Sequence, residues 1–133
     1  LAGKGHSINE LQSLLNKCGL ENEVHNKRMK TYSKGMRQKV GIAIALAKAA
    51  KVYLLDEPAS GLDPLASNEL SSLLKKLSSE GATIFMASHD IFRVRETCNR
   101  IGIIKKGELV KEMETSEVST NELENIYIDY MKI

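Results

Sequence analysis

Apolar residues recur every three or four positions through the first part of the chain, which is the spacing of amphipathic helices. Ser7 is a suitable N-cap for a first helix, and Gly19 is a suitable residue to end it. The apolar face of this helix is formed by Ile8, Leu11, Leu14, Leu15 and Cys18. Residues 20–32 are polar and aperiodic and predict a connecting segment. From Ser33, another good N-cap, an alanine- and isoleucine-rich run to Ala50 predicts a helix buried on most of its circumference.

In the middle of the chain, two short apolar runs flank a helical pattern. Residues 51–56 are mostly apolar and bounded by turn signals, which predicts a central strand covered on both faces. Asp63 and Pro64 are an N-cap followed by a proline in the first helical position, and the helix they predict continues to Gly81. Residues 83–87 predict a second apolar strand.

The last part of the chain predicts two further helices and a hairpin. The first of these helices carries the apolar residues Ile91, Val94 and Cys98. Strands at residues 101–104 and 109–113, joined by a turn at residues 106–107, predict a hairpin at a sheet edge. Residues 115–120 form a polar linker to the last helix. The apolar side of the last helix is formed by Leu123, Ile126, Tyr127 and Tyr130.

The order of strands and helices favours an α/β layered domain whose strands are at least partly parallel. In such domains, ligands bind beyond the carboxyl ends of the strands. Asp56 and Glu57 end one predicted strand, and Ser88 and His89 end the next. We therefore expect these two segments to converge on one crevice.

The adjacent acids at the end of the first strand suggest phosphate chemistry. Asp56 is placed to hold Mg²⁺, usually through water, where phosphates bind. Glu57 points differently from its neighbour and can orient or deprotonate an attacking water in phosphoryl transfer. For an isolated pair, the safer interpretation is two turn or helix-cap acids on the surface.

Composition narrows the class of protein. The chain has 133 residues, 42% of them hydrophobic and 27% charged, which suits one soluble globular core. The net charge of +2 and the absence of a long basic run do not support nucleic-acid binding. Cys18 and Cys98 show neither zinc-site nor disulfide spacing. No apolar run is long enough to span a membrane, and the start at Leu1 without a signal segment suggests an internal piece of a longer protein.

Four sequence segments between Tyr32 and Asp90 together resemble the ATP-binding cassette (ABC) ATPases. "VYLLDEP" resembles the Walker B segment, "SGLD" the D-loop, "SHD" the H-loop and "YSKGMRQKVGIAIALAKA" the signature helix, in the order of the family. The signature is most similar to exporter-type cassettes that read Tyr-Ser-Lys-Gly-Met. The resemblance implies a P-loop NTPase-type α/β fold, with a helical subdomain portion at residues 1–50 and the carboxyl-terminal part of the ATPase core at residues 51–133.

The resemblance also implies roles for individual residues. Ser33 and Gly35 match the signature positions that meet the γ-phosphate of ATP held by the opposite subunit, whereas Lys34 replaces a family glycine and either adds a cation near the phosphate or points to solvent. Asp56 is the implied Mg²⁺ residue, and Glu57 and His89 are the implied catalytic residues. The implied dimer contacts are the D-loop residues Ser60, Gly61, Leu62 and Asp63. A lone histidine is more often a core or surface residue, and Asp63 also has a structural role as an N-cap.

The phosphate-binding half of a cassette is missing from these residues. The phosphate loop reads Gly-x-x-x-x-Gly-Lys-Ser/Thr, and the glycines and lysine at residues 3–5 do not match it. The resemblance covers about the carboxyl-terminal half of a cassette. Residues 1–133 alone are therefore expected to be inactive.

The expected parent protein is the ATP-binding subunit of an ABC transporter, using ATP and Mg²⁺. Its implied partners are a second cassette subunit and a transmembrane permease, which would hold it on the cytoplasmic, inner face of the cell membrane. Two alternatives are open. One is a non-transport ABC-type ATPase of chromosome maintenance, DNA repair or the ribosome, and the other is a non-catalytic interaction fragment. The transported substrate cannot be inferred from these residues.

Overall fold

The computed structural model describes residues 5–132, so Gly3 and Lys4, which were compared with a phosphate loop and do not match it, lie outside the described residues. The chain forms two compact units, which divide between Ala87 and Ser88. The sequence predicted a different division at residue 50, between a helical subdomain and an ATPase core. That division concerns functional roles, and it stays a prediction.

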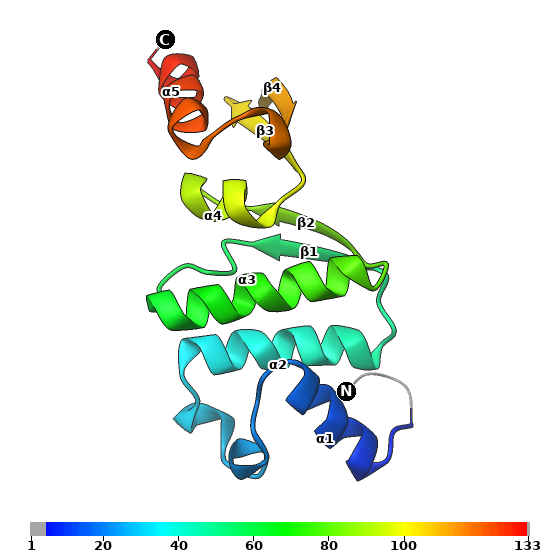
Figure 1. Ribbon diagram of the computed structural model, residues 1–133. Coiled ribbons are helices and arrows are strands. Elements are labelled where there is room, and N and C mark those ends of the chain that lie inside the picture. The colour runs from blue at the N-terminus through cyan, green and yellow to red at the C-terminus, as the bar shows by residue number, and fades with distance from the viewer. Residues whose placement is uncertain (1–4, 133) are drawn as a thin grey trace. The chain divides into compact units, whose positions relative to one another are not determined.

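The first unit consists of three helices and a pair of strands (Figure 1). Its elements are α1 (Ile8–Lys17), α2 (Lys34–Ala47), β1 (Val52–Asp56), α3 (Pro64–Ser79) and β2 (Thr83–Ala87), with short 3-10 helices at Asn22–Val24 and Met29–Thr31. The three predicted N-caps are confirmed. The side chains of Ser7, Ser33 and Asp63 each accept a hydrogen bond from the backbone N–H three residues later, which satisfies one open donor in each first turn.

The two strands of the first unit pair in parallel, with Val52 beside Thr83 and Asp56 beside Ala87. Because α3 connects them, the segment is a βαβ crossover, and the predicted α/β arrangement is confirmed. The prediction that residues 51–56 are covered on both faces is wrong for the described residues. Tyr53 is buried against α3, whereas the alternate side chains Val52 and Leu54 are exposed.

The core of the first unit lies between the helices and one face of the sheet. Its buried residues are Cys18, Ile42, Ala43, Tyr53, Leu70, Leu73, Leu74 and Leu77. The exposed residues of α2, Lys34, Arg37, Gly41 and Ile44, form one stripe along the helix, and its other residues are buried or partly buried, so the predicted burial of most of its circumference is confirmed. The helix ends at Ala47 rather than Ala50, since Ala49 adopts a φ of 54° and the Ala50 N–H bonds the Ala45 carbonyl at 3.0 Å.

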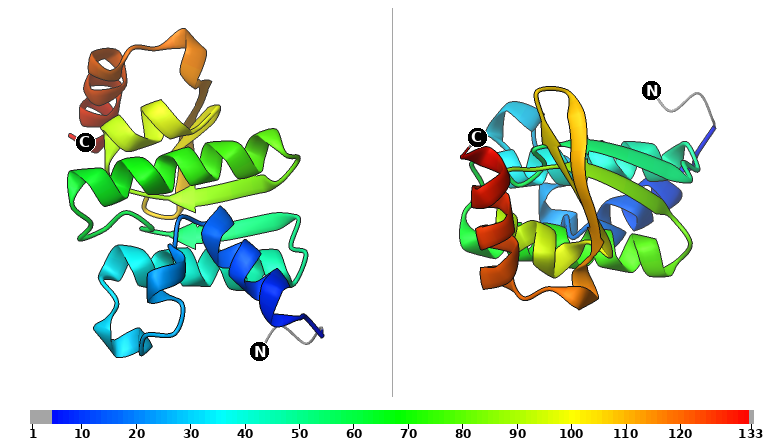
Figure 2. Two further views of the ribbon diagram at one scale, coloured as in Figure 1. Left: turned by 60° about the horizontal axis from the view of Figure 1, so that its bottom comes forward. Right: turned by 90° about the horizontal axis from the view of Figure 1, so that it is seen from above.

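The second unit is a hairpin packed with two helices, and its elements can be followed in Figure 2. They are α4 (Ile91–Thr97), β3 (Arg100–Lys105), β4 (Glu108–Glu114), a 3-10 helix at Thr115–Glu117 and α5 (Thr120–Met131). Lys106 and Gly107 have φ values of 50° and 83°, as a two-residue hairpin turn requires, and β3 and β4 form a two-stranded sheet of their own. Its buried core residues are Ile101, Ile103, Met113 and Leu123, whereas Tyr127, predicted on the apolar side of α5, is 38% exposed.

Cys18 provides a test of the core. Burial raises the pKa of the Cys18 thiol to about 11, although Lys17, Lys39 and Lys76 lower it, and the residue is 2% exposed. Burial also raises the pKa of Cys98, which is only partly buried. Since the thiolate is the reactive form, we expect a thiol reagent at pH 8 to modify Cys98 before Cys18 in the native chain. Mass spectrometry of the labelled peptides measures the order, and faster labelling of Cys18 would contradict this core.

Candidate active site

Two carboxylates follow the end of β1. Asp56 is the last residue of the strand and is exposed, and Glu57 is half-buried directly after it. The Glu57 N–H donates a hydrogen bond to the Ala87 carbonyl at 2.8 Å, so the pairing with β2 extends one residue beyond the strand. The two acids are therefore attached to the rigid end of a parallel sheet, the place where α/β folds bind ligands.

Glu57 has an unusual backbone conformation. Its φ is 46°, in the left-handed region that disfavours side chains with a Cβ. Neighbouring backbone hydrogen bonds hold this turn, from the Glu57 N–H to Ala87 and from the Ser60 N–H to the Glu57 carbonyl at 3.1 Å. Non-glycine residues kept in this region often belong to functional sites, because the strain is otherwise removed. At this turn Asp56 is exposed and Glu57 is half-buried.

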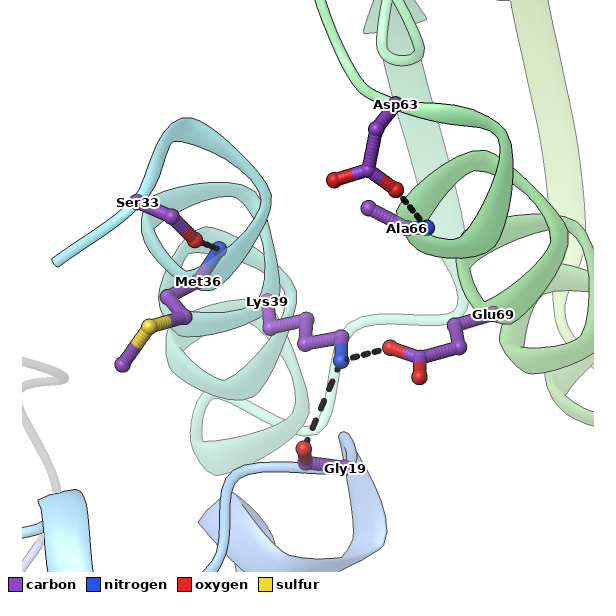
Figure 3. Close-up of polar contacts among 7 residues, drawn as sticks. All are labelled: Gly19, Ser33, Met36, Lys39, Asp63, Ala66 and Glu69. Atoms are coloured by element: carbon purple, nitrogen blue, oxygen red, sulfur yellow. Dashed lines mark hydrogen bonds and ion pairs between the residues drawn. The ribbon is translucent and has the colours of Figure 1, made fainter.

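The predicted D-loop is a compact turn between β1 and α3. The Leu62 N–H donates to the Ala59 carbonyl at 3.1 Å, and Gly61 has a φ of 70°. Asp63 then caps α3, accepting from the Ala66 N–H at 2.8 Å (Figure 3). The Asp63 carboxylate thus has a definite structural role, and any contact with a partner chain stays a prediction.

The signature segment begins the helix α2. The Ser33 hydroxyl accepts from the Met36 N–H at 3.1 Å (Figure 3), while the serine side chain remains exposed. Tyr32 is buried, and its phenol donates to the Val24 carbonyl. The Tyr32 carbonyl accepts from Arg37 Nη1 at 2.6 Å. These bonds anchor Tyr32 just before the cap, while Ser33 and Lys34 stay exposed.

Lys34 and Gly35 both face the D-loop segment of the same chain. A Cβ placed on Gly61 would lie 3.0 Å from Lys34 Nζ, so the lysine side chain covers this glycine. A Cβ placed on Gly35 would lie 3.2 Å from the Cβ of Ala66, so only glycine fits at the buried position 35 without displacing its neighbour. The structure thus brings the signature segment and the D-loop together.

His89 belongs to the second unit, two residues after the end of β2. It is exposed and precedes Asp90, which caps α4 by accepting from the Arg93 N–H at 3.0 Å. The Asp90 N–H in turn donates to Ser88 Oγ at 3.1 Å. The segment is therefore an ordered helix start, and a catalytic role for His89 stays a prediction.

The donor set suits Mg²⁺ better than a transition metal. Within residues 5–132, no three His, Cys, Asp or Glu side chains gather as a metal-binding cluster. Mg²⁺ commonly binds through one or two carboxylates, with waters and substrate phosphates as the other ligands. The exposed Asp56 carboxylate at the strand end fits that pattern.

Over residues 5–132, no helix has the length and apolar character needed to cross a bilayer.

One residue of this region was not singled out from the sequence. Lys39, within α2, has a side chain that is only 12% exposed, and its ammonium group pairs with Glu69 of α3 (Figure 3). Its neighbours Arg37 and Gln38 are also polar, so the local sequence does not single it out. The position of its acidic partner, 30 residues further along the chain, could not be read from local spacing.

Comparison with known proteins identifies the family. A family model described as "AAA domain, putative AbiEii toxin, Type IV TA system" matches residues 10–94. The lantibiotic transport ATP-binding protein SrtF of Streptococcus pyogenes is 40% identical over 110 residues, which are 83% of this chain and 48% of SrtF. The bacitracin transport ATP-binding protein BcrA of Enterococcus faecalis is 39% identical over 115 residues, 86% of this chain and 37% of BcrA.

A solved structure agrees with these relatives. The dimeric, post-hydrolysis ATP-binding cassette MJ0796 bound to ADP and Pi has a TM-score of 0.72 and 30% identity, over 85% of this chain and 50% of that one. The chain belongs to the ABC ATPases, and it also matches the AAA-domain family model described above. The predicted α/β cassette fold is thereby confirmed, and the ABC family is a nucleotide-binding one.

This ABC chain spans about half or less of the curated relatives that it matches. The activity and partners of a whole ABC protein are therefore matters for proposal. The description of the family model also names a putative toxin, whereas the relatives above are named as transport ATP-binding proteins.

The left-handed conformation of Glu57 predicts that glycine would relieve strain at this position. Replacing Glu57 by Gly removes a left-handed strain of roughly 1–2 kcal/mol and adds roughly 0.5–1 kcal/mol of backbone entropy cost. We expect Glu57→Gly to be neutral or more stable by up to about 1 kcal/mol in urea unfolding. Ser60→Gly, in the same loop without a positive φ, is the matched control and should lower stability. A clear loss of stability in Glu57→Gly, equal to that of the control, would contradict the strain.

Proposed function

We propose that the complete protein carrying this chain is the ATP-hydrolysing subunit of an ABC transporter. The observation that carries the proposal is the carboxylate pair at the end of β1, with Glu57 hydrogen-bonded to the neighbouring parallel strand. The names of SrtF and BcrA, both transport ATP-binding proteins, support transport over a chromosome or ribosome function.

In the proposed site, the two acids have separate tasks. Asp56 is exposed and would hold Mg²⁺ through its carboxylate or an intervening water, beside the β- and γ-phosphates of ATP. Mg²⁺, when bound, supplies positive charge that offsets the charge developing on the phosphates. Glu57 is half-buried on its strained turn and would orient the attacking water or accept its proton. His89 would donate a hydrogen bond to the γ-phosphate.

The signature segment would act on the nucleotide of a second subunit. The first turn of α2 offers backbone N–H groups and the positive end of the helix dipole, which attract phosphate. The Ser33 oxygen accepts from Met36, and its own hydrogen can still donate to a phosphate oxygen. Residues 60–63 would contact the same partner. The dimer of MJ0796 supports this arrangement by analogy.

The proposed partners follow from the same assembly. They are a second ABC cassette, identical or related, and a transmembrane permease that would hold the subunit at the cytoplasmic face of the cell membrane. We do not propose nucleic acid as a partner, because the net charge of +2 is small and the sequence contains no long basic run.

The first test removes the proposed catalytic carboxylate. Glu57→Gln in the complete protein keeps the shape of the side chain but cannot accept a proton, so ATP hydrolysis should fall by about a hundredfold or more. Dimers driven by ATP should persist, because binding groups are untouched. Steady-state phosphate release measures the rate, and Glu124→Gln in α5 is the matched control. Parental turnover in Glu57→Gln would remove Glu57 from the mechanism.

The second test concerns action between subunits. Ser33→Arg places a bulky side chain where the partner nucleotide would dock, so the monomer should still bind ATP while dimerisation and hydrolysis are lost. Mixing this variant with a subunit defective in its own phosphate loop should leave one working site of the two. Loss of ATP binding by the Ser33→Arg monomer would contradict a composite site.

A further inference from the structure

Two interface segments of this chain begin at the same end of a pair of helices. The helices α2 and α3 lie side by side and run in the same direction, so their first turns are neighbours (Figure 1). The signature residue Ser33 caps α2, and the D-loop residue Asp63 caps α3 (Figure 3). Segments separated by some thirty positions in the sequence are therefore presented together.

The first turns of the two helices are in close contact. The backbone at Gly35 approaches Ala66 so closely that a Cβ on the glycine would be 3.2 Å from the alanine Cβ and 3.6 Å from Leu62 Cδ2. A methyl group on Gly35 would therefore need Ala66 to shift by a few tenths of an ångström. Lys34 adds its side chain over Gly61 on the solvent side of the same contact. The spacing between signature and D-loop is therefore fixed by packing.

A second connection lies about one helical turn further along. Lys39 Nζ pairs with the Glu69 carboxylate of α3 and lies 3.4 Å from the Gly19 carbonyl, at the end of α1 (Figure 3). The lysine side chain is 12% exposed and that of Glu69 is 46% exposed, so the pair is partly shielded from water. Removing the Lys39 ammonium group would break its contacts with both the Glu69 carboxylate and the Gly19 carbonyl. Lys39 thus connects three helices at one point.

We propose that the signature segment, residues 33–35, and the D-loop, residues 60–63, of one chain form a single rigid docking element, for which Lys39 and Ala66 are positioning residues. The inference rests on the proposed function, because it concerns docking onto a second cassette. A pre-formed element does not have to be ordered when the partner binds, and this lowers the cost of association. Neither Lys39 nor Ala66 would touch nucleotide.

The first experiment measures dimerisation. In the complete protein carrying Glu57→Gln, where ATP-driven dimers should accumulate, Lys39→Met keeps the aliphatic stem and removes the charge. We expect the dimer dissociation constant, measured by analytical ultracentrifugation with ATP, to rise about tenfold, with the ATP affinity of the monomer unchanged. Lys39→Arg should restore dimerisation, as should the exchange Lys39→Glu with Glu69→Lys. Lys75→Met, at an exposed position of α3, is the control.

A second variant acts on the other contact. Ala66→Leu enlarges the side chain that faces Gly35 and should also weaken dimerisation without weakening monomer ATP binding. Parental dimerisation in both Lys39→Met and Ala66→Leu would overturn the proposal. Equal losses of dimerisation and monomer ATP binding would overturn it too, because they indicate general damage to the fold.

Hydrogen exchange tests the rigid element without any assumption about ATP. In the complete protein, Lys39→Met and Ala66→Leu should each accelerate amide exchange in residues 33–36 and in residues 60–62 together. Acceleration confined to the helix that carries the substitution would overturn the proposal. If the parental protein showed no ATP-driven dimer, the proposed function would fail, while this measurement would still decide whether the two segments form one element.

Discussion

The parallel pairing of β1 with β2 is the constraint on which the rest of the candidate site depends. It extends past the last strand residue, because the Glu57 N–H reaches the Ala87 carbonyl at 2.8 Å. This bond lies at the residue whose left-handed conformation its Cβ disfavours, so the chain turns sharply directly after the strand. One carboxylate is exposed and the other half-buried, a division of environments that suits a metal residue and a water-orienting residue.

Helix capping connects the fold to the proposed interface. Ser33 and Asp63 each satisfy a backbone N–H in the first turn of a helix, so the local sequence would keep them even without a partner subunit. Their helices are parallel, and the close approach at Gly35 brings the two capped ends together. A residue that caps a helix at the surface is already held in a defined position. The same short segments can therefore stabilise the monomer and present polar groups to another chain.

Local features were predicted well from the sequence, and features that depend on neighbouring layers were not. The caps at Ser33 and Asp63 and the turn at residues 106–107 follow from interactions within a few residues, and the structure confirms them. An apolar sequence does not tell whether one or both faces of a strand are covered by other elements. The expectation that β1 is covered on both faces was wrong, because Val52 and Leu54 are exposed. The Lys39 pair with Glu69 joins two helices, so no periodicity in either helix reveals it. The strain at Glu57 depends on a bond to the other strand.

The groups present in residues 1–133 explain why these residues are not expected to bind ATP by themselves. Asp56 and Glu57 are both acidic and repel a polyphosphate unless Mg²⁺ and phosphate-binding groups offset their charge. The positive first turn of α2 would act on the nucleotide of the partner and not on that of its own chain. A phosphate loop supplies a row of backbone N–H groups and a lysine, and no such sequence occurs in residues 1–133. In the proposed site, this chain therefore supplies the residue for Mg²⁺, the residue for the attacking water and the segments that face the partner. These groups can act on ATP only where other residues hold its phosphates.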